Sequence, residues 1–298
     1  MKIRYYLLAL TTLFMVSCEK DSLNSKSIFP DVQETNVNEF DKWLQTNFQE
    51  PYNILVKYRF EFKETTKDHE EVKNLAPAAY DKSIALAKLT KYLWLESYEE
   101  LKGRDFIRQY CPKILHFIGS YAYNSGGSVT LGVAEGGMKI SLYNVNNIDY
   151  ENPDIEFLNY WFFKTMHHEF AHILHQTKPY PTDFNEISAA DYQSESWVNI
   201  DDDDPNNHLK MGFISDYASR ETQEDLVELI ANYITHDQAW WDAQLETAGD
   251  TGKSKISAKL DMVRDWLKSA WDIDLDQLRT IVQRRSANVT MLDLQSLN

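Results

Sequence analysis

Cysteine is scarce in this sequence: its 298 residues include only Cys18 and Cys111. Two cysteines cannot build a disulfide framework or a thiolate cage for zinc, so a transition metal would have to be bound by histidine and carboxylate. Basic residues are also few, with 30 Lys and Arg against 46 Asp and Glu and a net charge of −16. This acidity argues against a nucleic-acid partner, because phosphate backbones are bound by positive charge.

The apolar stretch near the N-terminus is too short to span a bilayer. It runs from Tyr5 to Val16, follows two basic residues and ends at Ser17-Cys18. This pattern is typical of a secretory signal, so we expect residues 1–17 to be a signal peptide. Cys18 then stands where a bacterial lipoprotein has its lipid-carrying cysteine, and residues 18–35, rich in Ser, Asp and Asn, would be a tether. The alternative is an ordinary signal peptide with an incidental cysteine.

A metal-binding motif of the form H-E-x-x-H lies at residues 168–172. His168 and His172 are four residues apart, so on a helix both imidazoles can reach one cation. Glu169 lies about 100° around the helix, where it could act as a general base on a metal-bound water. An apolar stripe predicts that the opposite face of the same helix is buried: Phe162, Met166, Phe170 and Ile173. The alternative is a pair of ordinary histidines on a helix.

Residues 36–298 show no break in composition, so we predict one domain of the α+β class. It should combine a small mixed sheet, an active-site helix that carries the motif, and a helical C-terminal part. Residues 178–216 show little regular pattern and predict a long loop. Asp201–Asp204 within it lack the spacing of a calcium loop, which favours a solvated acidic loop over a calcium site. Alternation predicts strands at 54–62, 114–118, 129–133 and 138–142, and helical spacing predicts helices at 38–47, 77–103, 155–177, 222–235, 254–270 and 275–285.

A catalytic zinc site needs a third protein ligand. His175 lies on the face of His168, but seven helical residues rise roughly 10.5 Å, too far for one metal ion. Glu224 and Glu228 share one face of a second predicted helix and are better candidates. We favour Glu224 as the ligand and keep Glu228 as the alternative.

The two glutamates resemble the gluzincin arrangement, in which the first carboxylate binds zinc and the second orients a zinc-binding histidine. The resemblance implies these roles for Glu224 and Glu228. Tyr217, seven residues before Glu224, resembles the tyrosine that lethal-factor-type gluzincins place beside the zinc. It would donate a hydrogen bond to the oxyanion that forms during hydrolysis.

Four segments together resemble a family of zinc metallopeptidase lipoproteins linked to TonB-dependent nutrient import at the outer membrane. They are Cys18, Pro51–Ile54, His168–Gln176 and Tyr217–Glu228. The resemblance implies a zincin-like fold, a Zn²⁺ cofactor, and a peptide or protein substrate. It also implies a lipid anchor in the outer membrane, facing the cell surface, and a TonB-linked import complex as partner.

A non-catalytic alternative is a surface lipoprotein that uses a zincin scaffold to bind a nutrient polymer, either glycan or peptide. Trp240-Trp241 could stack on sugars. Glu169 argues for catalysis instead, because a purely structural metal site does not need a general base. For a peptide substrate, we expect the strand Met138–Tyr143 to lie beside the cleft and to pair with the extended chain.

Overall fold

The computed structural model describes residues 37–61, 75–123, 129–130, 132–135 and 137–297. The predicted signal peptide and tether, residues 1–35, lie outside the described residues. Residues 38–298 form one compact unit. Among the described residues, no helix combines the length and the apolar character needed to cross a membrane.

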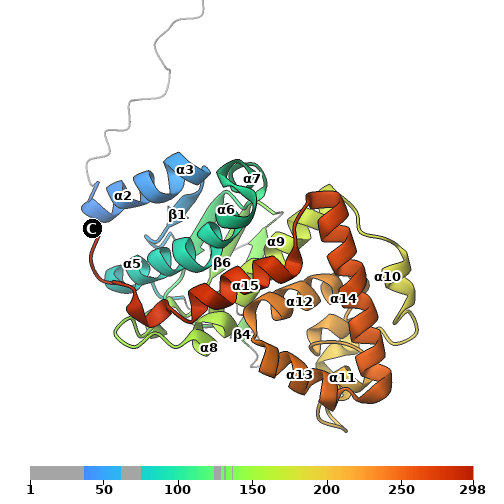
Figure 1. The fold of residues 1–298 in the computed structure, drawn as a ribbon. Coiled ribbons are helices and arrows are strands. Elements are labelled where there is room, and N and C mark those ends of the chain that lie inside the picture. Colours follow the sequence, from blue (N-terminus) through green and yellow to red (C-terminus); the bar gives the residue numbers. More distant parts are fainter. Residues whose placement is uncertain (1–36, 62–74, 124–128, 131, 136, 298) are drawn as a thin grey trace, which may run out of the picture. The chain divides into compact units, whose positions relative to one another are not determined.

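A four-stranded mixed sheet occupies the first half of this unit (Figure 1). Its order is β1-β2-β6-β5, and β5 pairs antiparallel to β6 while the other pairs are parallel. The strands are β1 (Leu55–Lys57), β2 (Ile114–Phe117), β5 (Gly132–Glu135) and β6 (Lys139–Leu142). A separate pair, β3 (Ala122–Tyr123) and β4 (Val129–Thr130), precedes β5. The sheet and the helices around it confirm the predicted α+β class.

The first strand is shorter than predicted. The predicted alternation is real, since Ile54, Val56 and Tyr58 are buried while Leu55 is 45% exposed. Only three residues pair with β2, however, and Tyr58 instead turns its hydroxyl to Asp41, to which it donates a hydrogen bond at 2.8 Å. Burial therefore alternates beyond the end of the strand.

Helices surround the sheet and form the C-terminal half (Figure 1). The predicted helix at 77–103 begins later, at Tyr80, and its middle is a π-helical stretch. The predicted helix at 254–270 extends from Gly249 to Trp271, and the helix at 238–247 was not predicted. The first half contains α2 (Glu39–Leu44), η2 (Gln45–Gln49), α3 (Glu50–Tyr52), α5 (Tyr80–Leu89), η3 (Thr90–Leu95), α6 (Glu96–Lys102) and α7 (Arg104–Tyr110). The second half contains α8 (Ile155–Leu158), η5 (Asn159–Phe163), α9 (Lys164–Thr177), α12 (Thr222–Thr235), α13 (Gln238–Thr247), α14 (Gly249–Trp271) and α15 (Leu275–Ser286).

The segment 178–216, predicted as a long loop, is not structureless. It contains three short helical pieces, α10 (Asp183–Glu186), η6 (Ser194–Asn199) and α11 (Asn207–Met211). Two aspartates of the acidic run have side-chain partners: Asp201 lies 2.6 Å from the Nδ1 of His208, and Asp204 pairs with Lys210 at 2.7 Å. The preference for a solvated acidic loop over a calcium site stays a prediction.

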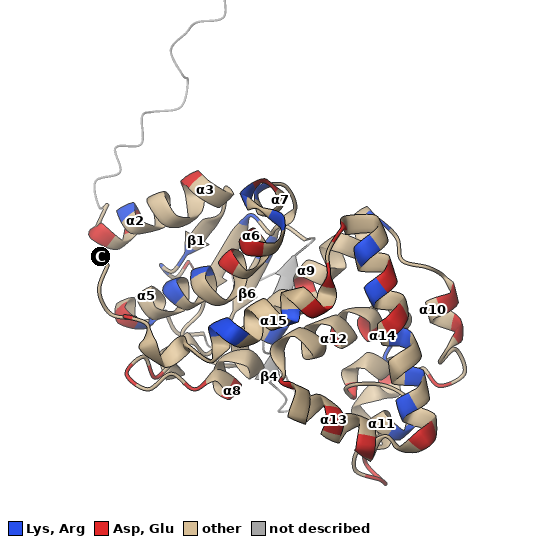
Figure 2. Cartoon of the chain, viewed as in Figure 1, with Lys and Arg blue, Asp and Glu red and all other residues tan. Residues whose placement is uncertain are grey.

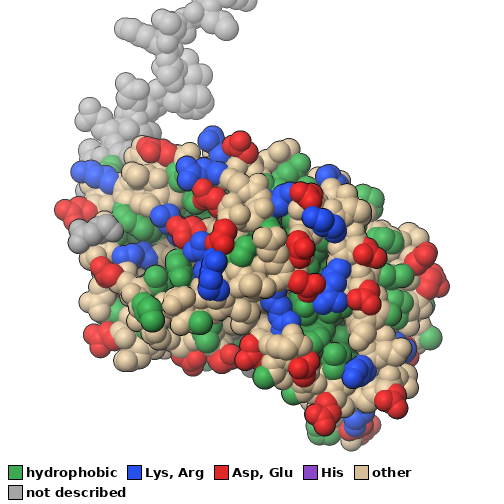
Figure 3. All heavy atoms as spheres, viewed as in Figure 1, with side chains coloured by type: hydrophobic (Ala, Val, Ile, Leu, Met, Phe, Trp, Pro, Cys, Tyr) green, Lys and Arg blue, Asp and Glu red, His purple; other side chains and the backbone are tan. Residues whose placement is uncertain are grey.

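Charged residues lie mainly on the outer faces of the helices. Acidic and basic residues alternate along α14, and the face shown in Figure 3 mixes both signs (Figures 2 and 3). The motif helix α9 instead has its back in the core, where Phe162 on the preceding turn and Met166 and Phe170 are fully buried. Ile173, the fourth residue of the predicted stripe, is only partly buried. Packing of this face against the core fixes the direction in which the opposite face of α9 points.

Candidate metal centre

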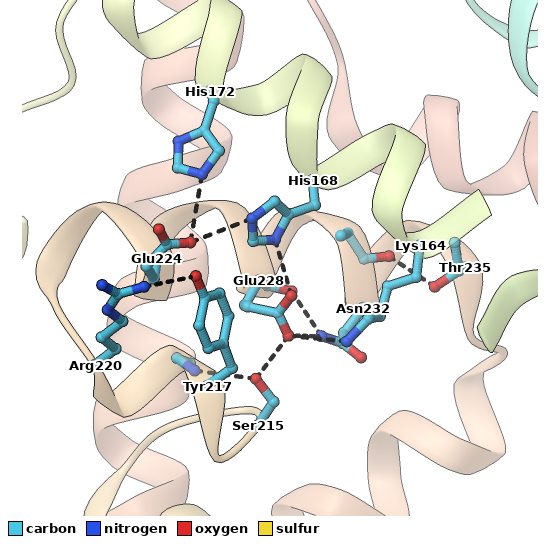
Figure 4. A network of polar contacts seen from close by, with 12 residues as sticks. Lys164, His168, His172, Ser215, Tyr217, Arg220, Glu224, Glu228, Asn232 and Thr235 are labelled. Carbon is cyan, nitrogen blue, oxygen red and sulfur yellow. Dashed lines mark hydrogen bonds and ion pairs between the residues drawn. The ribbon is translucent and has the colours of Figure 1, made fainter. Parts of the chain in front are cut away.

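Two helices, α9 and α12, supply the three predicted metal ligands. Their ligand atoms, from His168, His172 and Glu224, all lie within 4.8 Å of one another. The Oε2 atom of Glu224 is 3.2 Å from the Nε2 of His168 and 3.3 Å from the Nε2 of His172 (Figure 4). The structure therefore brings together two residues of the motif and a carboxylate more than fifty positions away.

The convergence fits a cation better than it fits a hydrogen-bonded cluster. Oε2 of Glu224 is buried and makes no hydrogen bond of acceptable geometry in the described structure. A buried carboxylate oxygen without a donor is costly. Two imidazole nitrogens and one carboxylate oxygen are the donor set that zinc accepts. These three residues are thus able to hold Zn²⁺.

The second nitrogen of His168 is fixed by Glu228, the alternative ligand of the sequence analysis. Nδ1 of His168 lies 2.8 Å from Oε1 of Glu228, to which it can donate. When the ring is neutral in this tautomer, the lone pair of Nε2 is directed at the centre. Glu228 is only 2% exposed and lies behind His168 (Figure 4). This placement corresponds to the orienting role that the gluzincin resemblance implies.

Three further donors hold Glu228 itself. Its Oε2 accepts from Ser215 Oγ at 2.7 Å, Lys164 Nζ at 3.1 Å and Asn232 Nδ2 at 3.2 Å. Burial alone would raise the pKa of Glu228, but Lys164 and His168 outweigh it and keep the pKa well below its usual range. Glu228 is therefore an anion. The sequence analysis did not identify Lys164, Ser215 or Asn232, although Lys164 lies one helical turn before His168 and Asn232 one turn after Glu228.

His175 has a different role from that of a ligand, as the distance argument predicted. Its Nε2 lies 2.9 Å from Nδ1 of His172. In the tautomer that leaves Nε2 of His172 free for a metal, Nδ1–H of His172 donates to Nε2 of His175. Burial lowers the pKa of His175 to about 4, so it remains a neutral acceptor. The two metal-facing histidines are thus oriented by unlike partners, one a carboxylate and one a neutral imidazole.

Glu169 lies beside the three converging side chains. It is partly buried, and this burial raises its pKa, while His168 and His172 lower it and Glu224 raises it further. A raised carboxylate pKa suits a group that accepts a proton and then releases it. The role of general base stays a prediction.

Tyr217 lies against His168, with ring centroids 6.0 Å apart. Its hydroxyl accepts a hydrogen bond from Nη1 of Arg220 at 3.2 Å (Figure 4). Its ring is nearly perpendicular to that of Trp197, with centroids 4.9 Å apart. Burial, with Glu224 nearby, raises the pKa of Tyr217 to about 12, so the phenol keeps its proton near neutral pH. Because Arg220 occupies the oxygen as a donor, the hydroxyl proton is free to point elsewhere. Neither Arg220 nor Trp197 was identified from the sequence.

A buried ion pair supports α12 next to Glu224. Lys259 on α14 lies 2.6 Å from Asp225, and both side chains are almost fully buried. Tyr192 also donates to Asp225, and Lys259 donates to the carbonyl of Gly212. These bonds join α12, α14 and the preceding segment, and so fix the rotation of α12 that turns Glu224 toward α9.

The sheet edge beside the centre is β5, not the strand predicted to bind an extended peptide. Strand β6, within the predicted segment Met138–Tyr143, pairs with β2 on one side and β5 on the other, so it has no free edge. That prediction is wrong. Alternation of apolar and polar residues predicts which side chains lie on each face of a strand, but not which strands pair with its edges. In the described part of the chain, β5 is one of the two edge strands of the sheet, and β1 is the other.

Trp240 and Trp241 do not form a sugar platform. Trp240 stacks on His236, with ring centroids 3.9 Å apart and planes at 12°, and Trp241 is only 4% exposed. Trp241 is therefore a core residue, and His236 covers one face of Trp240. A pair of exposed indole rings is not present at this position.

The chain matches a family model over residues 33–276, and that family is described as "putative zinc-binding metallo-peptidase". The chain belongs to this family. It is also similar to a solved structure, described as a putative zinc-binding metallo-peptidase from Bacteroides caccae, with 38% identity and a TM-score of 0.75. The match covers 91% of this chain and all of the other. No curated protein matches the sequence. The family described as zinc-binding agrees with the donor set formed by His168, His172 and Glu224.

Proposed function

We propose that this protein is a zinc-dependent peptidase of the gluzincin type. The observation that supports the proposal is the convergence of His168, His172 and Glu224 with Glu169 beside them. Three protein ligands leave a coordination position for water or substrate, as in catalytic rather than structural zinc sites. Family membership supports the same class of activity.

Each residue of the centre has a distinct task in peptide hydrolysis. Bound zinc would supply a Lewis acid and lower the pKa of a coordinated water. Glu169 accepts the proton of the attacking water and returns it to the leaving amine. Tyr217 donates its hydroxyl proton in a hydrogen bond to the carbonyl oxygen as negative charge develops there. Glu228 and His175 hold the imidazoles of His168 and His172 in the tautomers that face the centre.

The proposal includes the location inferred from the N-terminal sequence. The protein would be exported, lipidated at Cys18 and anchored at the outer membrane, facing the cell surface. There it would serve nutrient import with a TonB-linked complex. The support is the signal-like segment, the position of Cys18 and the family resemblance of the sequence. Metabolic labelling with a radioactive fatty acid tests the anchor: the wild type should be labelled, and a Cys18→Ala variant should not.

Two substitutions test the peptidase. We expect Glu224→Ala to lower the zinc content of the purified protein, and undiminished zinc would contradict its role as ligand. Glu169→Gln should retain zinc but lose hydrolysis of a mixed peptide library by about 10²–10⁴-fold. Glu246→Gln, on the exposed surface of α13, is the matched control and should change neither quantity. Full activity of Glu169→Gln would remove that residue from the mechanism.

A further inference from the structure

A group of aromatic side chains, two of them exposed and three partly buried, lies just before the motif helix. It consists of Tyr121, Tyr123, Phe157, Tyr160 and Trp161, and we refer to it as the aromatic platform. Trp161 is its centre, with the rings of Tyr121, Tyr160 and Phe157 at 5.0, 5.3 and 6.3 Å. Tyr123 and Tyr160 are 61% and 57% exposed, so these rings are not core residues. Clustered exposed aromatics of this kind mark binding surfaces.

The platform and the metal ligands lie on one continuous helical segment. Trp161 lies in η5, which continues directly into α9, and it precedes His168 by seven residues. It is therefore roughly 10 Å along the helix axis from His168. A surface at this distance from the metal centre is within reach of the same bound molecule.

The edge strand β5 connects the platform to the centre. A Cβ atom placed on Gly132, at the start of β5, would lie 2.6 Å from the side chain of Thr165, and one on Gly137, just after β5, would lie 3.2 Å from Ile173. Strand β5 thus runs along α9 from one turn after Trp161 to beyond His172. Its start is joined to β3 and β4, which carry Tyr123.

An extended peptide on this edge would reach the platform about three residues from the cleaved bond. Extended chains advance about 3.3 Å per residue, so roughly 10 Å corresponds to three residues. Antiparallel addition to β5, the more stable pairing, directs the peptide from the Ile173 end toward the Thr165 end. The C-terminal part of the substrate would then lie over Trp161 and its neighbours.

We propose that the aromatic platform is a substrate-specificity site that selects a large aromatic or apolar side chain about three residues C-terminal to the cleaved bond. The inference rests on the proposed peptidase function. A peptide is favoured over a glycan as the occupant because the platform is continuous with a strand edge, which offers backbone hydrogen bonds to a peptide. Tyr123 and Tyr160 are more than half exposed, so their rings are available to cover an apolar side chain.

Peptidyl hydroxamates test the site without requiring turnover, because the hydroxamate binds the metal and fixes the register of the peptide. The probes are a succinyl-hydroxamate-Ala-Phe amide and its Ala-Ala counterpart, bound to the zinc-loaded protein. We expect the wild type to bind the Phe compound about tenfold more tightly. In Tyr123→Ser/Tyr160→Ser the two affinities should become equal, while the Ala-Ala affinity stays unchanged. Met291→Ser, which alters another exposed apolar side chain, is the control and should keep the preference.

The proposal would be overturned if the wild type bound the Phe and Ala-Ala compounds with equal affinity. It would also be overturned if the double variant kept the full preference for the Phe compound. A glycan site would be identified, and the peptide proposal overturned, if an immobilised polysaccharide retained the wild type but not the double variant. Trp161→Phe provides a milder test, because it keeps an aromatic ring and should retain most of the preference. Failure of the peptidase proposal gives a different result: the Phe preference persists, but no peptide of a mixed library is cleaved.

Discussion

Zinc affinity should depend steeply on pH because His168 and the metal compete for the same nitrogen. Burial alone would lower the pKa of His168, but its close contacts with the carboxylates of Glu224 and Glu228 outweigh burial and raise the pKa to about 9. In the metal-free protein near neutral pH, His168 is therefore an imidazolium between two carboxylates. Zinc must displace that proton before it can bind Nε2.

The size of the effect follows from the pKa. Below a pKa of about 9, each decrease of one pH unit lowers the deprotonated fraction of His168 about tenfold, which costs about 1.4 kcal/mol of zinc-binding free energy. The zinc affinity at pH 7 should thus be roughly a hundredfold weaker than at pH 9, and it should level off above pH 9. Competition with a chelating zinc indicator, in zinc-buffered solutions from pH 7 to 10, measures the curve.

The variant Glu228→Gln separates two opposing effects. Loss of the carboxylate lowers the pKa of His168, so the curve should level off at a lower pH. Loss of the charged acceptor behind His168 should also weaken the plateau affinity by about 10–100-fold. Glu246→Gln should reproduce the wild-type curve. A wild-type affinity that is flat between pH 7 and 9, or a Glu228→Gln curve identical to it, would refute this account of the centre.

Three further substitutions address other parts of the structure. His175→Ala should weaken zinc binding about 10–100-fold, because it leaves Nδ1 of His172 without its acceptor. His175→Gln should retain most of the wild-type zinc affinity. Equal zinc affinity of the wild type and both variants would contradict this role of His175. Lys259→Met should destabilise the fold by about 3–5 kcal/mol, because it leaves the buried carboxylate of Asp225 without its cation. Calorimetry should show this as a decrease of about 10 °C in Tm. Lys253→Met, on the exposed face of the same helix, is the control and should change Tm little. Tyr217→Phe should lower kcat about 10²-fold with zinc content unchanged; an unaltered kcat would show that its hydroxyl is not the oxyanion donor.

The sequence was sufficient to predict which three side chains converge, and for the two histidines local geometry is enough. The four-residue spacing of His168 and His172 fixes their common helix face wherever the helix lies. Glu224 followed from the need for a third ligand together with the resemblance of its helix to a known arrangement. Its rotation toward α9 depends on Lys259, a residue from a distant helix, and no local pattern contains that information.

The parts that the sequence did not predict depend on how elements are assembled. Alternation identified β6 as a strand but could not show that β2 and β5 occupy both of its edges. Ser215 approaches Glu228 from a segment without a regular pattern, so no periodicity predicts their hydrogen bond. Such contacts arise from tertiary packing, which the spacing of residue types along one segment does not encode.

The charges around the centre show why a dication suits it better than protons. Glu224, Glu228 and Glu169 lie close together, and the described ion pairs of this group provide one permanent cation, Lys164, which pairs with Glu228 alone. In the metal-free state the excess negative charge is reduced by the proton that these carboxylates retain on His168. A divalent cation neutralises more charge and at the same time is a ligand partner for the buried Oε2 of Glu224, which makes no hydrogen bond of good geometry in the described structure. The network behind the ligands therefore stabilises the metal-bound arrangement in two ways, through the charge of Glu228 and through the tautomers that Glu228 and His175 impose.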